Sequence, residues 1–174
     1  MTVAKTLLFT LLLSCVCLVG QNPVSAQEAV SDAGKEKIGK IKATVYYGTD
    51  GVVTKLGKNA TVVPDAVSKR LKGIEKMRFK NYRQLGTDSQ PVLRSYENWV
   101  SPLKPSEEIM LSFESRGVTG NTGLRLDLEL WQHKRKVMKS DPVLYQNRPL
   151  YILGPKWRDG RLIIAVELIA LTSQ

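Results

Sequence analysis

The chain of 174 residues has 26 lysines and arginines against 16 aspartates and glutamates, with one histidine and two cysteines. A chain of this length buries enough apolar surface to fold as one domain without disulfides or metals. Zinc sites usually take three or four histidine, cysteine or carboxylate ligands, so this inventory argues against zinc chemistry. We expect no metal and no other cofactor.

The first 26 residues have the features of a secretory signal peptide. Lys5 precedes the apolar run TLLFTLLLSCVCLVG, and the polar stretch QNPVSA ends in small residues at Ala26. A basic start, a short apolar core and small residues at the end are typical of such leaders, and the run is shorter than the ~20 residues of a membrane span. We expect export to the periplasm or the exterior, with cleavage after Ala26. The alternative is a lipoprotein with Cys15 lipidated.

Residues 27–40 are mostly small and charged, which predicts a flexible linker before a single domain over residues 41–172. The domain opens with an alternating segment in which Ile41, Ala43, Val45 and Tyr47 share one face. This period of two predicts a half-buried strand.

The segment PDAVSKRLKGIEKM, residues 64–77, predicts the one clear helix. Pro64 and Asp65 are ordinary start signals, although Gly73 weakens the helical interior. The opposite faces carry basic residues. We expect the apolar stripe to pack against a sheet, while attachment to anionic lipids is the alternative. The stripe consists of Val67, Leu71, Ile74 and Met77, and the basic residues are Lys69, Arg70, Lys72 and Lys76.

The remainder of the chain predicts strands separated by turn residues. The strand over residues 123–131 has four leucines on one face, whereas the last strand is apolar on both faces and must be covered by a layer on each side. Those layers would be a second sheet, or a sheet and the helix. We therefore predict an α+β domain, a mainly antiparallel β-sheet or sandwich with one packed amphipathic helix. The predicted strands are residues 78–86, 91–100, 107–115, 123–131, 136–140, 148–153 and 161–171.

The block HKRK, residues 133–136, lies between two of these strands. The apolar pattern stops at Leu130 and resumes at Val137, so the block predicts the exposed tip of a hairpin. His133 is the single histidine, and no G-x-S-x-G segment supplies a nucleophile for it. Asp127 and Glu129 share one strand face at a spacing that glycoside hydrolysis could use, but Arg125 beside them favours plain cross-strand ion pairing.

Aromatic and basic residues at two hairpins are the candidate binding residues. Trp157 is predicted to lie in a loop bounded by glycine and proline. An exposed tryptophan beside cations could stack on a sugar or contact an acidic partner, and the alternative is that the tryptophans fill the core or cover the end of a hairpin. No nucleic-acid recognition motif accompanies the basic residues, so we expect no nucleic-acid partner. The candidates are Trp131, Lys134, Arg135, Lys136, Trp157 and Arg158, and none is predicted to be catalytic.

Two phrases carry a resemblance to other proteins. In the first, LKGIEKMRFKNYRQLG, Phe79 and Tyr82 form an aromatic-x-x-Tyr pattern, and in the second, RPLYILGPKWRDGRLIIAV, Gly154, Asp159 and Gly160 mark a hairpin. Together with LRLDLELW, these phrases resemble short exported bacterial proteins of planctomycete type that have no assigned activity. The resemblance implies a fold plan, and it implies no active residues. Pro155 also belongs to the second phrase.

The charge distribution completes the functional expectation. Residues 27–83 contain 13 basic and 6 acidic residues, whereas residues 84–174 contain 12 and 10. An exported positive surface favours anionic neighbours. We expect an exported, non-enzymatic binding or scaffolding protein of the bacterial envelope that contacts an anionic protein, polymer or surface. The alternative is a carbohydrate-binding module or a weak glycan-active enzyme, and the oligomeric state stays open.

Overall fold

The structure is a computed structural model that describes residues 32–53, 56, 60–100, 102–104 and 106–172. All of them belong to the compact unit Ser31–Gln174. The predicted signal peptide, Cys15 and the first part of the predicted linker lie outside the described residues.

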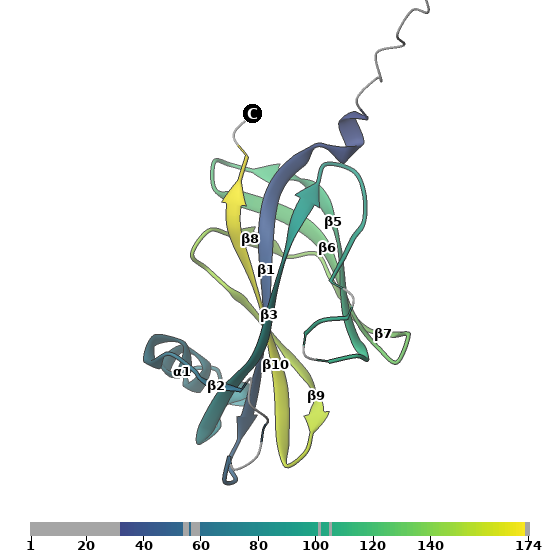
Figure 1. The fold of residues 1–174 in the computed structure, drawn as a ribbon. Coiled ribbons are helices and arrows are strands. Elements are labelled where there is room, and N and C mark those ends of the chain that lie inside the picture. The colour runs from purple at the N-terminus through teal and green to yellow at the C-terminus, as the bar shows by residue number, and fades with distance from the viewer. Residues whose placement is uncertain (1–31, 54–55, 57–59, 101, 105, 173–174) are drawn as a thin grey trace, which may run out of the picture. The chain divides into compact units, whose positions relative to one another are not determined.

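The described residues form two antiparallel sheets (Figure 1). The first sheet has the strand order β2-β3-β1-β10-β9, and the second has the order β4-β5-β6-β7, with β8 also paired to β6. The predicted α+β sandwich with one helix is confirmed. The first sheet contains β1 (Lys37–Thr49), β2 (Thr61–Val62), β3 (Asn81–Leu93), β9 (Leu150–Trp157) and β10 (Gly160–Leu171). The second contains β4 (Asn98–Val100), β5 (Ile109–Thr119), β6 (Gly123–Gln132), β7 (Arg135–Ser140) and β8 (Val143–Tyr145).

The main hydrophobic core lies between the two sheets. The alternating leucines of β6, from Leu124 to Leu130, meet apolar side chains of β1 and β10 in one cluster. Phe113 of β5 is fully buried in the same cluster. The period of two read from the sequence therefore identifies the inner face of the second sheet.

The helix α1 (Asp65–Lys72) packs on the other face of the first sheet. Leu71 is fully buried there against Tyr46, Ile163 and Ala165. Figure 1 shows α1 and the strands β5 to β7 on opposite sides of β1, β3 and β10. The prediction that β10 is covered on both faces is thus confirmed, with a sheet on one side and the helix on the other.

The helix is shorter than the predicted segment 64–77. It ends at Gly73, whose N–H donates to the carbonyls of Lys69 and Arg70, and Ile74 is extended. A separate 3₁₀ turn, η2 (Glu75–Met77), then places Met77 in the same cluster as Leu71. Glycine has the lowest helix propensity of residues other than proline, which explains the break at this position.

The predicted linker ends too late, because β1 begins at Lys37 after a short 3₁₀ turn, η1 (Ala33–Lys35). Ile38 is only 4% exposed and belongs to the core between the sheets, and Lys37 pairs with Leu93 of β3. One apolar residue among lysines and glycines gives no periodicity, so long-range pairing decides this segment.

The strand boundaries after the helix also differ from the prediction. Residues 81–93 form one strand that runs through Pro91, and residues 98–100 form a separate short strand in the other sheet. Proline is tolerated where a strand has a free edge. The short β2 pairs only with Arg83 and Gln84, so among the described strands β1 alone pairs with β3 at Pro91.

The HKRK block forms the tip of the β6–β7 hairpin, as predicted. Gln132 pairs with Arg135, which leaves a turn of two residues, His133 and Lys134. Both have left-handed backbones, with φ of 49° and 61°. Such a turn matches the twist of the two strands, although glycine or asparagine usually occupies these positions.

Candidate functional site

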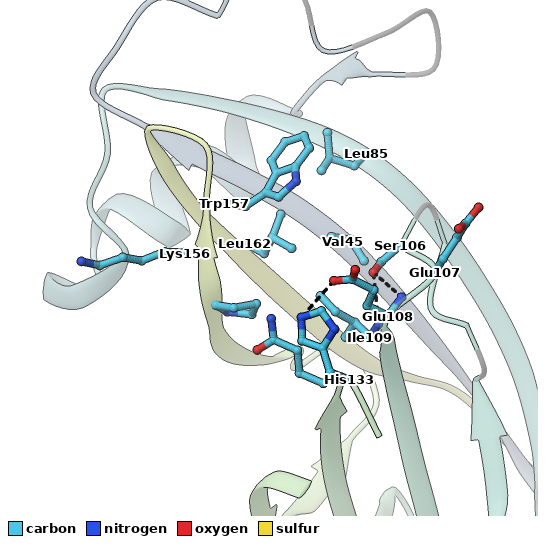
Figure 2. A pocket seen from close by; sticks show the side chains of 12 residues that line it. Val45, Leu85, Ser106, Glu107, Glu108, Ile109, His133, Lys156, Trp157 and Leu162 are labelled. Atoms are coloured by element: carbon cyan, nitrogen blue, oxygen red, sulfur yellow. Dashed lines mark hydrogen bonds and ion pairs between the residues drawn. The ribbon is translucent and has the colours of Figure 1, made fainter. Parts of the chain in front are cut away.

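The β6–β7 hairpin and the hairpin of β9 and β10 both border a hollow of about 510 Å³ between the sheets (Figure 2). Its apolar lining includes Val45, Leu85, Ile109 and Leu162, with Trp157 beside them. The volume is in the range of small-ligand sites, about 300–1,000 Å³. The polar rim consists of Ser106, Glu107, Glu108, Gln132, His133 and Lys156.

Two contacts hold the rim together by joining Glu108, the residue before β5, to the β6–β7 tip. The His133 N–H donates to the Glu108 carbonyl at 3.1 Å, and His133 Nε2 lies 3.2 Å from Glu108 Oε2. The two side chains are 61% and 60% exposed, so water screens their attraction. Figure 2 shows Lys156 and Glu107 pointing away from the apolar floor.

Trp157 is half-buried at the end of the β9–β10 hairpin, so its predicted loop position is wrong and the alternative of a hairpin-end tryptophan is confirmed. It is the last residue of β9, it pairs with Gly160 of β10, and its ring meets Tyr47 edge-on at 5.1 Å between centroids. The Arg158 guanidinium lies 4.5 Å from the indole centroid. The sheet extends to this residue because only Arg158 and Asp159 form the turn.

Asp159 and Tyr82, from the two segments that carry the resemblance to exported bacterial proteins, each form hydrogen bonds within the fold. The Tyr47 hydroxyl donates to the Asp159 carboxylate, and the Thr49 hydroxyl donates to it at 3.2 Å. The hydrogen bond from Tyr47 lowers the pKa of Asp159, while burial raises the pKa of Tyr47. In the other phrase, the Tyr82 hydroxyl accepts from the Phe79 N–H. These contacts join turns to neighbouring strands.

Trp131 lies on the outer face of the second sheet, as predicted. Its indole N–H donates to Glu129 at 3.0 Å, and Lys136 Nζ lies 5.5 Å from the ring centroid. A second tryptophan, Trp99 of β4, approaches Trp131 at 5.7 Å between centroids and is 37% exposed. Sequence reasoning missed Trp99, although its position beside the buried Val100 was a signal, because neighbours on a strand face opposite sides.

The carboxylates Asp127 and Glu129 are paired with cations. Arg116 lies 2.6 Å from Asp127, and Lys136 lies 2.9 Å from Glu129, while Lys139 approaches both. The hydrogen bond from Arg116 lowers the pKa of Asp127, and that from Lys136 lowers the pKa of Glu129. A glycosidase acid needs a raised pKa, so this pair is arranged for ion pairing. These cations lie on the neighbouring strands, Arg116 on β5 and Lys136 and Lys139 on β7, so the predicted cross-strand ion pairing is confirmed.

The six candidate residues therefore fall into three groups. Trp131 and Lys136 lie together on the outer sheet face, and Trp157 and Arg158 lie together on the other hairpin. Lys134 and Arg135 are exposed at the β6–β7 tip. The hollow adjoins both hairpins but includes only Trp157 of the six.

Six basic residues lie on or next to α1, and we call this group the α1 cation cluster. All six of its residues are exposed, and no ion pair joins any of them to a carboxylate of the described residues. Its closest internal link is a hydrogen bond from Arg78 Nε to the Lys72 carbonyl at 3.0 Å. The cluster consists of Lys69, Arg70, Lys72, Lys76, Arg78 and Lys80.

No protein-family model, curated protein or solved structure matches this chain. Within the ranges that the structure describes, no three histidine, cysteine or acidic side chains gather as metal ligands. No helix in the same ranges is long and apolar enough to cross a membrane.

Proposed function

We propose that the protein is an exported, non-enzymatic binding protein of the bacterial envelope that contacts an anionic partner through the α1 cation cluster. The observation that carries the proposal is the group of six exposed cations without an ion-pair partner among the described carboxylates. Residues 65–80 contain these six cations against two carboxylates, Asp65 and Glu75. Such an excess of positive charge produces a field that attracts anions and steers their approach.

The sheet beneath the helix keeps these cations in fixed positions. Leu71 and Met77 are buried against the first sheet, so α1 and η2 present the opposite side to solvent. A docked helix loses less conformational freedom on binding than a flexible basic tail. The surface therefore suits an extended acidic chain, such as an envelope polymer or an acidic protein segment.

Fluorescence anisotropy with labelled polyglutamate tests this function directly. The wild-type chain without residues 1–26 is compared with a triple variant carrying Lys69→Glu, Lys72→Glu and Lys76→Glu. The matched control carries Lys134→Glu, Arg135→Glu and Lys156→Glu, which changes the net charge equally at other exposed positions.

The cluster variant should bind about a hundredfold more weakly at low salt, since a lysine near an anionic surface contributes about 1 kcal/mol. The control should lose much less. Equal losses in both variants, or no binding by the wild type, would contradict the proposal. Vesicles of phosphatidylglycerol, tested in parallel, would reveal whether a lipid surface is preferred to the polymer.

A further inference from the structure

Two tryptophans share the outer face of the second sheet, on the side away from the first sheet and α1. Trp99 of β4 pairs with Ser112 of β5, and Trp131 of β6 pairs with Met110 of β5. The two indoles thus lie diagonally across β5, inclined to each other by 52°. They form an aromatic surface on the outer face of the sheet. On this face the other outward side chains of β6 are charged.

Polar groups border this aromatic surface. Ser112 is only 2% exposed, and its hydroxyl donates to Glu97 Oε1. Glu129 accepts from the Trp131 indole, and Lys136 lies beside both. A carboxylate has about four lone-pair positions, so the exposed Glu97 keeps acceptor positions for further hydroxyl donors. The side chain of Glu129 is 15% exposed and already accepts from Trp131 and Lys136, so its part is to hold these two side chains in place.

The electrostatic balance of the face distinguishes it from the α1 cation cluster. Its carboxylates at Glu114, Asp127 and Glu129 are paired with Arg116, Lys136 and Lys139. Such a compensated surface has no strong net field that would attract a polyanion or a polycation. It matches an uncharged ligand that offers apolar C–H faces and many hydroxyls.

We propose that Trp99 and Trp131 form a binding site for a neutral oligosaccharide. A sugar ring stacks its C–H face on an indole, which is a large and rigid apolar surface. Its hydroxyls donate to Glu97, and Lys136 donates to a ring or hydroxyl oxygen. The site is independent of the proposed contact with an anionic partner, because it uses other residues on the opposite layer of the sandwich.

Isothermal titration with cellohexaose, laminarihexaose, chitohexaose and mannohexaose tests this site. The chain without residues 1–26 is compared with Trp99→Ala, Trp131→Ala and the control Trp157→Phe, which changes the third tryptophan in the other sheet. At least one oligosaccharide should bind saturably to the wild type. Each of the two alanine variants should bind it about tenfold more weakly or worse, while Trp157→Phe should bind as the wild type does.

A spectroscopic measurement on the wild type covers the case of a variant that fails to fold. The three indole N–H resonances are assigned, and the same oligosaccharide should shift those of Trp99 and Trp131 while leaving that of Trp157 in place. No binding of any of the four probes, or binding that shifts only Trp157, would overturn the site. The Lys69→Glu, Lys72→Glu, Lys76→Glu variant should bind sugar normally, which separates this test from that of the anionic partner.

Discussion

The α1 cation cluster and the outer face of the second sheet are both rich in charge, yet they differ in compensation. In the cluster, residues such as Lys69 and Lys72 point to solvent without an ion-pair partner among the described carboxylates. On the sheet face, Arg116, Asp127 and Lys139 form a connected network. On neighbouring strands, Lys139 lies directly across from Glu129, and Arg116 of β5 reaches Asp127 of β6. A single docked helix has no such neighbour on its exposed side. Compensation, more than the number of charges, decides which surface attracts an anion.

The largest expected effect tests whether the cluster depends on helix docking. Leu71→Ala removes a fully buried side chain between α1 and the first sheet. We expect it to lower the free energy of unfolding by about 2–5 kcal/mol, as measured by urea denaturation. Lys72→Ala, on the exposed side of the same helix, should change it by less than about 0.5 kcal/mol. Similar losses for both variants would show that α1 is not anchored by this contact.

Salt provides the next test, because only the uncompensated surface should respond strongly. Raising the ionic strength from low salt to 1 M shortens the screening length to about 3 Å. Polyglutamate binding through the cluster should then be lost, whereas oligosaccharide binding at Trp99 and Trp131 should change little. Titrations of both probes over a salt series measure this contrast. Equal salt sensitivity of the two would remove the distinction between the surfaces.

Acid should weaken the sheet face selectively. The pKa values of Asp127 and Glu129 are lowered in the folded protein by Arg116 and Lys136. Their ion pairs therefore add stability above the ordinary pKa values of about 4, and that stability is lost as the pH falls through the lowered values. A double variant, Asp127→Asn with Glu129→Gln, should show a flatter decrease of Tm between about pH 4 and pH 2 than the wild type. A parallel decrease in both proteins would exclude these carboxylates as the cause.

The smallest expected effect concerns the turn at the end of this face. Lys134 has a φ of 61°, a region that costs residues with a Cβ about 1–2 kcal/mol relative to glycine. Lys134→Gly should raise the free energy of unfolding by up to about 1 kcal/mol and leave polyglutamate binding almost unchanged. Lys156→Gly, in the strand β9, should destabilise instead. Chemical denaturation of both variants gives the comparison.

Short-range patterns predicted much of this fold. The alternating leucines of β6 identified the inner face of the second sheet, and the apolar residues on both faces of β10 required a layer on each side. The HKRK block was recognised as a hairpin tip because the apolar pattern stops and resumes around it. These features depend on the side-chain period of a single strand, which a sequence displays directly.

Long-range pairing decided what the sequence could not display. Ile38 enters the core because β1 pairs with β3 from Lys37 onward, and β3 continues through Pro91 because β1 alone of the described strands pairs with it there. Trp157 is half-buried against Tyr47, a residue more than a hundred positions earlier in the chain. Local composition does not record which distant strand lies alongside, so these positions were predicted wrongly.

For the two candidate binding surfaces, some features could be predicted from the sequence and others depended on the tertiary structure. The amino-acid sequence by itself determined that basic residues gather around residues 69–80 and that Trp131 lies on a polar strand face. Only the tertiary structure brought Trp99 to within 5.7 Å of Trp131 and paired the charges of the second sheet, because these contacts join separate strands. The physical reason is that a sequence specifies the spacing of side chains along one element, while the packing of strands and helix decides which charges are neutralised and which remain available to a partner.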